Sequence, residues 1–501
     1  MRASGILLPV FSLPSRYGIG CFSKEAYTFA EQLARAGQRY WQILPLGPTG
    51  YGDSPYQSFS AFAGNPYFID LDTLAAEGLL LPEEYKEVLY GEEEARVDYG
   101  RLYEVRFDIL KRAFLRADTE EDADYADFCR ENAFWLDDYS LYMAVKECFG
   151  GKSWEEWDED IRLRRPEALA RYRKLCREEI SFHCFLQYQF YRQWDRLKAY
   201  VNEKGIRIIG DIPIYVALDS ADSWASPELF RFDENRRPVK VAGCPPDAFS
   251  ADGQLWGNPL YDWDYHERTG YRWWIRRMKH CFRIYDVVRV DHFRGFDEYY
   301  TIPYGSRTAA GGCWEKGPGL KLFLALKEHL KEVPIIVEDL GYLTESVIKL
   351  VRDTGYPGMK VLEFAFDSRE AGDYMPYRYP ENCVVYTGTH DNQPLAAWYE
   401  EMSEEDRALA RDYLALDGKT REETVWAFIR LALACKADTC MIPMQDYLCK
   451  DGSARINKPS TIGNNWCWRL GKEEFTEKLQ EKIRRLTEVY GRLSNGSVQQ
   501  G

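Results

Sequence analysis

Eight short apolar runs, rich in β-branched residues and bounded by turn residues, recur along the chain. Runs of this kind are typical of strands that are buried on both faces of a sheet. Helical patterns separate several of them. The alternation indicates an α/β protein with a parallel sheet, and eight repeats predict a closed (β/α)8 (TIM) barrel. The expected strands are Ile6–Val10, Tyr40–Leu44, Ile206–Ile212, Tyr285–Val290, Ile335–Glu338, Lys360–Phe364, Cys383–Thr387 and Thr439–Met444, and the clearest helical patterns are Lys24–Ala36, Tyr271–Phe282, Gly319–Lys331 and Glu422–Ala437.

Two segments are too long to be simple connections within such a barrel. Residues 73–172 are charged, Leu-rich and helical in pattern, which predicts an inserted helical subdomain between the second and third strands. Residues 220–263 hold Pro, Gly and aromatic residues and predict an irregular inserted loop. A long loop after a barrel strand lies on the catalytic face. We therefore expect residues 1–501 to form one barrel domain that carries both insertions.

Charge and cysteine usage exclude several classes of function. The chain has 65 Lys+Arg and 80 Asp+Glu, a formal net charge of −15, which argues against nucleic acid and anionic membranes as partners. The sequence contains no stretch of 18 apolar residues, so it predicts no transmembrane helix. The 13 cysteines include no Cys-x-x-Cys pair, which argues against zinc ribbons and thioredoxin-type chemistry. We expect a cytoplasmic enzyme with free thiols, as a monomer or weak homodimer.

Acidic residues stand at or just beyond the ends of four expected strands: Asp211, Asp291, Glu338 and Asp391. In a barrel these ends converge on one mouth. Arg289 lies two residues before Asp291, so both point to the same side of the strand and the guanidinium would keep that carboxylate ionised. Paired carboxylates without a Cys/His metal cluster suit glycoside chemistry, in which one carboxyl is ionised and its partner is protonated.

Eight motifs then occur in order along almost the whole chain. They are GILLPVFSLPS (5–15), PLGPTGYGDSPYQ (45–57), GDIPIYVA (210–217), GQLWGNPLY (253–261), RVDHFRG (289–295), EDLG (338–341), GTHDN (388–392) and NNW (464–466). On these motifs the chain resembles the 4-α-glucanotransferases of glycoside hydrolase family 77, also called amylomaltases or disproportionating enzymes. The resemblance implies transfer of α-1,4-glucan segments between malto-oligosaccharides, with neither a cofactor nor a metal.

The resemblance also implies roles for individual residues. Asp291 would be the nucleophile that forms a covalent β-glucosyl-enzyme, and Glu338 would be the general acid and then the general base. Asp391 would be a third carboxylate that grips sugar hydroxyls in the transition state. The resemblance implies that Arg289 and His390 contact the sugar before the scissile bond, that Asp211, Ser54 and Tyr56 contact it at the mouth, and that Phe249, Trp256, Asn464 and Trp466 belong to loops over the acceptor sites.

Other interpretations stay open on the residues alone. An Asp at a strand end often only caps the next helix, and Glu338 with Asp339 could bind a divalent metal. We include His292 among the substrate contacts, but a core histidine fits that position equally well. Trp256 and Phe249 could be core residues, and Ala248 stands where many relatives carry Tyr. The competing functions are an α-amylase-like hydrolase, a catalytically silent glucan-binding protein, and a metal-dependent lyase or aldolase barrel.

Overall fold

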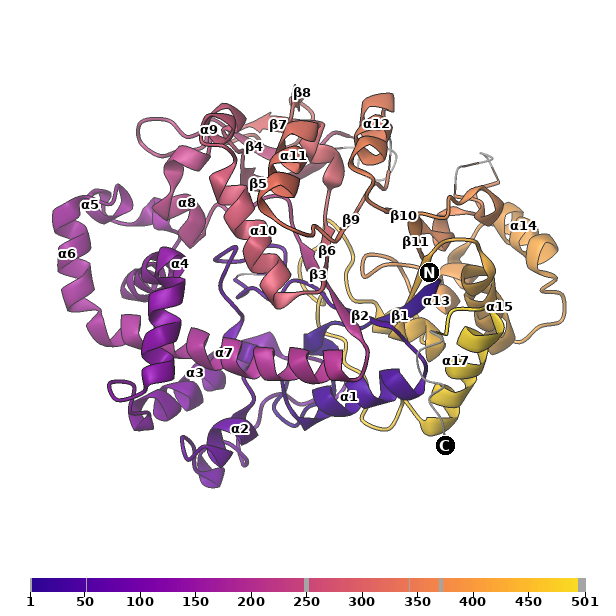
Figure 1. Ribbon diagram of the computed structural model, residues 1–501, viewed down its shortest axis with the longest axis horizontal. Coiled ribbons are helices and arrows are strands. Elements are labelled where there is room, and N and C mark those ends of the chain that lie inside the picture. The colour runs from indigo at the N-terminus through magenta and orange to yellow at the C-terminus, as the bar shows by residue number, and fades with distance from the viewer. Residues whose placement is uncertain are drawn as a thin grey trace.

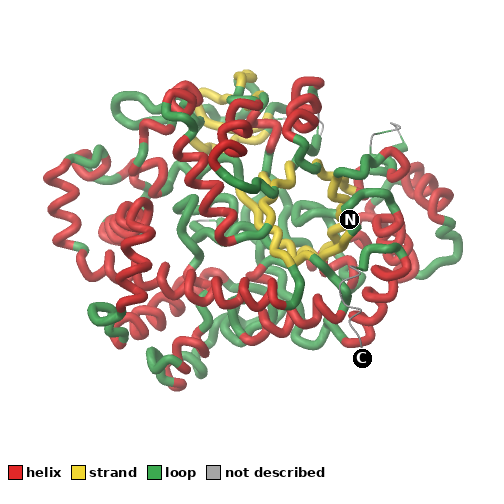
Figure 2. Tube along the Cα trace, viewed as in Figure 1, coloured by secondary structure: helices red, strands yellow, loops and turns green. Residues whose placement is uncertain are grey.

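The eight expected strands form a closed parallel barrel in a computed structural model, which describes residues 2–50, 52–246, 252–341, 343–368, 372 and 374–493. Around the barrel the order is β1-β12-β11-β10-β9-β6-β3-β2, and every neighbouring pair is parallel. This confirms the predicted (β/α)8 fold (Figures 1 and 2). The barrel strands are β1 (Ala3–Leu7), β2 (Tyr40–Gln42), β3 (Arg207–Ile212), β6 (Val287–Val290), β9 (Ile335–Val337), β10 (Gly358–Val361), β11 (Cys383–Tyr386) and β12 (Thr439–Pro443).

Alternate residues of these strands face two different layers, because successive side chains of a strand point to opposite sides. One set forms its own buried cluster, drawn from every barrel strand except β2, as expected for a filled barrel interior. The other set joins the large cluster that includes the surrounding helices. The interior set is Leu7, Ile209, Val287, Ile336, Met359, Val361, Val384, Tyr386 and Met441.

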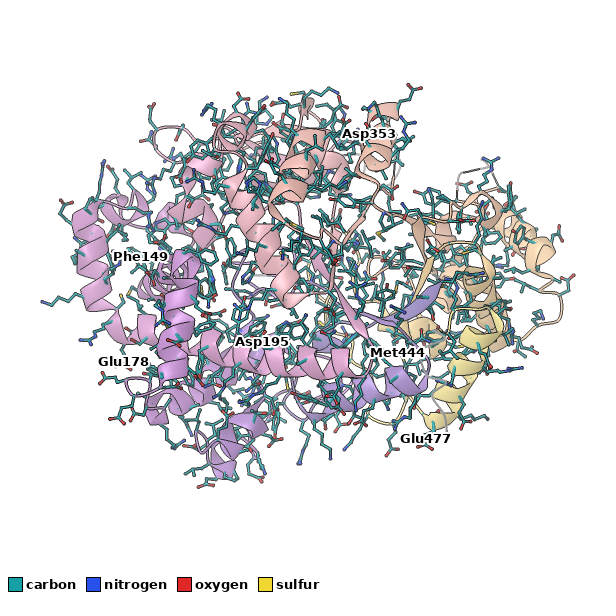
Figure 3. All side chains as sticks on the ribbon, in the orientation of Figure 1. Phe149, Glu178, Asp195, Asp353, Met444 and Glu477 are labelled. Carbon is teal, nitrogen blue, oxygen red and sulfur yellow. The ribbon has the colours of Figure 1, made fainter. Side chains whose placement is uncertain are left out.

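Helices surround the barrel and extend far to one side of it. In Figure 1 α4, α5 and α6 lie at the opposite end of the molecule from α17, and the long α7 runs from that end to the barrel. Figure 3 marks Glu178 and Asp195 along α7 and Glu477 at the start of α17. The helices are α1 (Lys24–Arg35), α2 (Leu71–Ala76), α3 (Tyr99–Arg116), α4 (Ala123–Cys148), α5 (Glu159–Arg162), α6 (Pro166–Leu175), α7 (Arg177–Glu203), α8 (Ala221–Ala225), α9 (Trp263–Arg268), α10 (Arg272–Ile284), α11 (Leu320–His329), α12 (Glu345–Thr354), α13 (Leu395–Glu401), α14 (Glu404–Leu414), α15 (Arg421–Ala434), α16 (Met444–Tyr447) and α17 (Glu477–Val489). The described part of the chain holds no helix that is long and apolar enough to cross a membrane.

A second sheet, which the sequence did not predict, has the antiparallel order β5-β4-β7-β8. Its strands are β4 (Lys240–Cys244), β5 (Gln254–Pro259), β7 (Glu298–Pro303) and β8 (Cys313–Lys316). The first two come from the segment 220–263, which is thus less irregular than expected, and the other two follow β6. Helices α2 to α6 occupy most of residues 73–172. That these two segments are separate insertions stays a prediction.

Several expected strands extend beyond the observed ones, and two of them end three residues too late. β1 ends at Leu7, because Pro9 lacks a backbone N–H and the chain continues as a 3-10 turn at Val10–Ser12. β10 ends at Val361, and residues Leu362–Phe364 form another 3-10 turn. The expected run there includes Glu363, which lies in this turn and is buried.

The first and last strands of the barrel pair with each other and close it. β1 pairs with β12, with Ala3 opposite Thr439. Arg492, which follows α17 and is 1% exposed, donates hydrogen bonds from its guanidinium to the carbonyls of Ala3 (3.0 Å), Leu433 (2.8 Å) and Cys435 (3.0 Å). The last described residues are thereby tied to the first strand.

Candidate active site

The predicted carboxylates lie at the carboxyl ends of barrel strands. Asp211 lies within the end of β3, Asp291 follows β6 directly, Glu338 follows β9 directly, and Asp391 lies in the loop after β11. A cleft of about 500 Å³ opens there. It is lined by Ser54, Tyr56, Gln57, Pro213, Ile214, Tyr215, Gly253, Gln254, Leu255, Trp256, Asn258, Asp291, His292, His390, Asp391, Asn457, Pro459, Ser460 and Trp466.

Arg289 joins two of the carboxylates. Its Nη1 lies 2.6 Å from Oδ2 of the fully buried Asp211, and its Nη2 lies 3.0 Å from Oδ1 of the more accessible Asp291. Burial acts to lower the pKa of Arg289, but the two carboxylates outweigh it and raise that pKa well above its ordinary value. Burial raises the pKa of Asp211, and Arg289 opposes that shift. A permanently charged guanidinium therefore stands beside Asp291, as the sequence spacing predicts.

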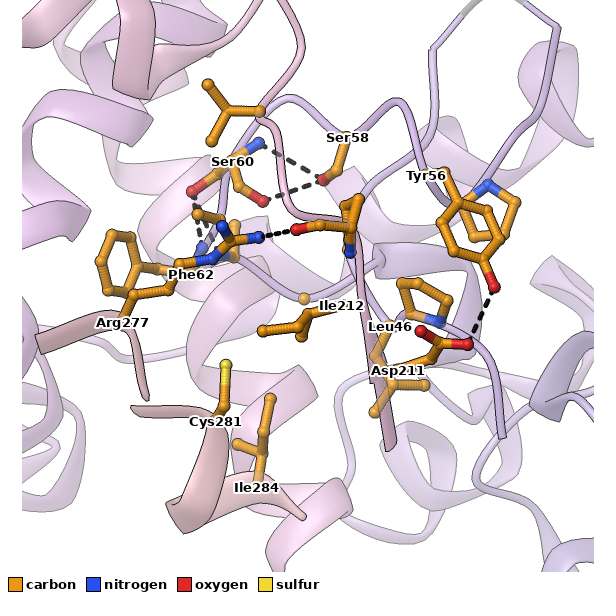
Figure 4. Close-up of a pocket in the computed structure, with 18 of the residues that line it drawn as sticks. Leu46, Tyr56, Ser58, Ser60, Phe62, Asp211, Ile212, Arg277, Cys281 and Ile284 are labelled. Atoms are coloured by element: carbon orange, nitrogen blue, oxygen red, sulfur yellow. Dashed lines mark hydrogen bonds between the residues drawn. The ribbon is translucent and has the colours of Figure 1, made fainter. Parts of the chain in front are cut away.

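Tyr56 connects this pair to His390. Its hydroxyl donates to Asp211 Oδ2 (2.9 Å; Figure 4) and lies 3.0 Å from His390 Nε2. Because the single phenol proton goes to Asp211, Nε2 of His390 donates to the phenol oxygen. Burial, followed by the charge of Asp211, raises the pKa of Tyr56 well above its ordinary value, so it remains a donor. The two rings are stacked, with centroids 5.3 Å apart.

Figure 4 also shows a smaller cavity behind these residues. It has a volume of about 50 Å³ and lies among Leu46, Tyr56, Asp211, Ile212 and residues of α10. Arg277 of α10 donates to the carbonyls of Pro213 (2.6 Å) and Ile214 (2.9 Å), the residues that follow β3 into the main cleft. The loop that carries this wall of the cleft is therefore fixed from behind.

Glu338 has an environment unlike that of Asp291. Its carboxyl oxygens accept hydrogen bonds from the backbone N–H groups of Leu340 (2.7 Å) and His292 (2.9 Å). Burial, and then the nearby charge of Asp291, raises its pKa to about 7, although Arg289 and the two N–H donors oppose the shift. One carboxyl at this mouth is thus ion-paired with a guanidinium, and the other has a raised pKa, as acid–base chemistry requires.

His292 is held in a special backbone conformation. It has a φ of 51°, in the left-handed region that non-glycine residues seldom adopt. Its ring meets the edge of Trp256, with centroids 4.8 Å apart at 89°. Burial lowers its pKa to about 4. A neutral imidazole, whose Nε2 has no hydrogen-bond partner among the described residues, therefore lines the cleft.

Asp391 is held by residues that the sequence reasoning missed. Asn457 donates from Nδ2 to Asp391 Oδ1 (2.6 Å), and Arg455 donates to the Asp391 carbonyl (2.5 Å). His390 Nε2 lies 3.4 Å from the same carboxyl oxygen. The missed signal is the polar stretch RINKPS (455–460), which precedes the NNW motif in a segment without an expected strand.

The structure brings together most of the other predicted contacts. Ser54, Trp256 and Trp466 line the cleft, and the Trp466 ring lies 6.0 Å from that of His390. Asn464 is exposed, with a φ of 57°, and does not line the cleft. Phe249 and Ala248 lie outside the described residues, so the expectation of an aromatic lid there remains untested.

The alternative of a metal at Glu338 and Asp339 has little geometric support. Asp339 Oδ1 accepts the N–H of Met359 (2.7 Å), while backbone N–H groups occupy both oxygens of Glu338. Among the described residues, no three His, Cys, Asp or Glu side chains gather closely enough to hold a metal ion.

A closed parallel barrel with a differentiated carboxyl pair at its mouth defines a (β/α)8-barrel enzyme equipped for glycoside chemistry. The sequence matches the family described as 4-alpha-glucanotransferase over residues 8–474. The 4-alpha-glucanotransferase of Clostridium butyricum is 48% identical over 486 residues, covering 96% of this chain and 99% of its relative. That of Thermus thermophilus is 47% identical over 501 residues, with 98% and 99% covered. The chain belongs to the 4-alpha-glucanotransferase family.

Solved structures agree with this assignment. The amylomaltase from Streptococcus agalactiae in complex with acarbose has a TM-score of 0.95 and 44% sequence identity, and the match covers 99% of this chain and all of that one. The sequence-based recognition of the family and of the barrel fold is thus confirmed.

Proposed function

We propose that this enzyme transfers α-1,4-glucan segments from a donor to the 4-OH of an acceptor glucan or glucose, by a retaining double displacement. The observation that carries the proposal is the contrast between Asp291, which is ion-paired with Arg289, and Glu338, whose pKa is raised to about 7. One carboxylate is available as a nucleophile while the other holds a proton. The amylomaltase from Streptococcus agalactiae was solved in complex with acarbose, which supports a glucan-like ligand for this chain.

In the first step Asp291 attacks C1 of the donor sugar as Glu338 protonates the departing glycosidic oxygen. The bond from C1 to that oxygen breaks, and a covalent glucosyl ester of Asp291 forms. In the second step Glu338, now a carboxylate, takes the proton from the acceptor 4-OH, whose oxygen attacks C1 and releases Asp291. Two inversions leave the α configuration unchanged. Such chemistry gives ping-pong kinetics and uses no cofactor.

The remaining predicted residues hold the sugar in place. We propose that Asp391 and His390 bind hydroxyls of the reacting sugar, because both line the cleft and are fixed by Asn457 and Tyr56. Arg289 holds Asp291 in position through their ion pair. Trp256 offers a further surface for a glucose ring, since aromatic faces stack on sugars at low entropic cost. Ser54 and the nearly buried Trp466 also line the cleft.

We further propose that the substrates are malto-oligosaccharides derived from glycogen or starch and that the enzyme works in the cytoplasm. Its described cysteines are all free thiols, which supports a reducing compartment. A monomer or weak homodimer remains the expected assembly, and the net charge of −15 supports neither nucleic acid nor anionic membrane as a partner.

The proposal is tested with maltotriose as the only substrate. Transfer gives glucose and a ladder of longer maltodextrins while the number of reducing ends stays constant, because each cleaved bond is re-formed. Hydrolysis by an α-amylase-like enzyme would instead raise the number of reducing ends with every glucose released. Absence of any glucose would support a silent glucan-binding protein, and loss of activity with a chelator would support a metal-dependent barrel enzyme.

The rate should fall on the alkaline side of about pH 7. Glu338 must be protonated to act as the acid, and its raised pKa means that the protonated fraction declines as the pH rises through about 7. The measurement is kcat/KM for maltotriose between pH 5 and 9. A rate that stayed level from pH 6 to 9 would contradict the assignment of Glu338 as the acid.

A further inference from the structure

A second pair of acids, Glu363 and Asp446, lies beneath the loop Gly388–Asn392, which carries His390 and Asp391. Glu363 follows β10 and Asp446 follows β12, and they are 7% and 2% exposed. Neither lines the cleft, and no step of the proposed reaction uses them. Two buried carboxyls at the catalytic end of the barrel therefore need an explanation.

Glu363 is in direct contact with the loop. A methyl group placed on Gly388 would lie 2.7 Å from Glu363 Oε1, so the carboxyl occupies the space that any larger residue would need. The side chain of Asn392 hydrogen-bonds to the same carboxyl. Glu363 also donates its backbone N–H to the Thr387 carbonyl (3.2 Å). The carboxyl thus supports the loop from below at both of its ends.

From Asn392 a chain of hydrogen bonds continues to Asp391. The Asn392 Oδ1 atom accepts from the backbone N–H of Thr389 (2.9 Å) and from its hydroxyl (2.8 Å). The Thr389 hydroxyl oxygen in turn accepts the backbone N–H of Asp391 (3.3 Å). The orientation of the Asn392 amide, which Glu363 fixes, therefore determines how the Asp391 backbone is held.

The surroundings favour a neutral Glu363. Its Oε1 is buried with no hydrogen-bond partner among the described residues, which a carboxylate tolerates poorly. The acids Asp446 and Glu401 face it, while the hydrogen bond from Asn392 and the charge of Arg455 favour the ionised form. Arg455 itself donates to the carbonyls of Asp391 and Asn457. Burial, and then the charge of Asp446, raises the pKa of Glu363 well above its ordinary value.

Asp446 is held differently. Its two carboxyl oxygens accept from the Thr387 hydroxyl (2.6 Å) and from the Leu395 N–H (2.8 Å). Burial raises its pKa to about 7. Its carboxyl is therefore satisfied by donors, whereas that of Glu363 is not.

We propose that Glu363 is a positioning residue that acts as a neutral carboxylic acid, holding the Gly388–Asn392 loop through Asn392 and Thr389 so that Asp391 meets the substrate. The inference rests on the proposed role of Asp391 in binding the reacting sugar. Ionisation of Glu363 would place a second negative charge beside Asp446 and disturb the loop. The loop is thereby coupled to the protonation of a group outside the cleft.

The test compares Glu363→Gln with Glu363→Ala. Glutamine keeps the shape and neutrality of the protonated acid and should retain kcat within about twofold at pH 6. Alanine leaves a hole beneath Gly388 and should lower kcat about tenfold, with a smaller change in KM, because Asp391 acts in the transition state. Glu401→Gln is the matched control, since it removes an exposed acid facing the same site and should change neither value.

A second measurement follows the pH. The pKa of Glu363 is higher in the folded chain than in the unfolded chain. The stability that this difference gives the fold is fully present below the unfolded pKa. It is lost as the pH rises toward the folded pKa. The wild-type Tm should therefore fall more steeply with rising pH than that of Glu363→Gln. Glu338 titrates in both proteins, but only the wild type also loses the proton of Glu363. The alkaline fall in kcat should therefore be steeper in the wild type.

Two results would overturn the proposal. One is a Glu363→Gln protein as impaired as Glu363→Ala at pH 6, which would show that a charged carboxylate is needed. The other is an identical pH dependence of Tm in wild type and Glu363→Gln, which would show that Glu363 does not titrate from a neutral state. The Tm measurement needs no substrate, so it is separate from any failure of the proposed reaction, and it remains informative if Glu363→Ala does not fold.

Discussion

Replacing Asp291 with asparagine is expected to lower the rate of glucose release from maltotriose by at least about 10⁴-fold. The amide has nearly the same size, but it cannot form the glycosyl ester on which both steps depend. No other described carboxyl can replace it, because Asp211 is fully buried against Arg289 and Glu338 is bound to two backbone N–H groups. Circular dichroism and Tm should show that the barrel remains folded.

Asp286→Asn is a suitable control for this variant. Asp286 stands at the other end of the same strand, where it accepts the Ile208 N–H (2.7 Å) and pairs with Lys198 (3.1 Å). Its replacement should leave kcat unchanged below the unfolding temperature. If Asp291→Asn retained a tenth of the wild-type rate, the assignment of the nucleophile would be wrong.

Replacing Glu338 with alanine is expected to lower the rate with maltotriose by roughly 10²–10⁴-fold. The glycosidic oxygen of a natural substrate is a poor leaving group, and Glu338 supplies the proton that it needs. Alanine is preferable to glutamine, because the carboxyl accepts from two N–H groups and an amide nitrogen would face one of them.

An α-glucosyl fluoride distinguishes the acid from a residue that only supports the site. Fluoride leaves with little proton donation, so release of fluoride by Glu338→Ala should be close to the wild-type rate in the first turnover. Regeneration of the enzyme should stay slow, since the same residue is the base in the second step. Absence of rescue in a folded variant would show that Glu338 is not the acid.

The barrel could be predicted from the sequence because its strands are buried on both faces and therefore read as unbroken apolar runs. The antiparallel sheet could not, because its strands are partly exposed and because β4 and β7 pair across a long connection. Cys313–Lys316, for example, shows no alternation of buried and exposed residues. Local patterns carry little information about pairing between distant segments.

The carboxylates of the site could be predicted because they stand at the ends of strands that read as unbroken apolar runs. Asn457 and Arg455 could not, because they lie far from any expected strand end and act on Asp391 from a loop. Glu363 lies within an expected strand, and nothing in the sequence sets it apart as a residue that supports the site. Its interior position depends on the 3-10 turn that replaces the end of that strand.

The pairing of β1 with β12 has a consequence for the synthesis of the protein. A nascent chain on the ribosome holds an open sheet, with unpaired edges on β1 and β11, until Thr439–Pro443 has emerged. Exposed edges of this kind invite pairing with other chains. The lock that Arg492 forms on Ala3 is added later still. Barrel closure therefore waits for β12, and the interval before its synthesis is when nascent chains are most exposed to aggregation.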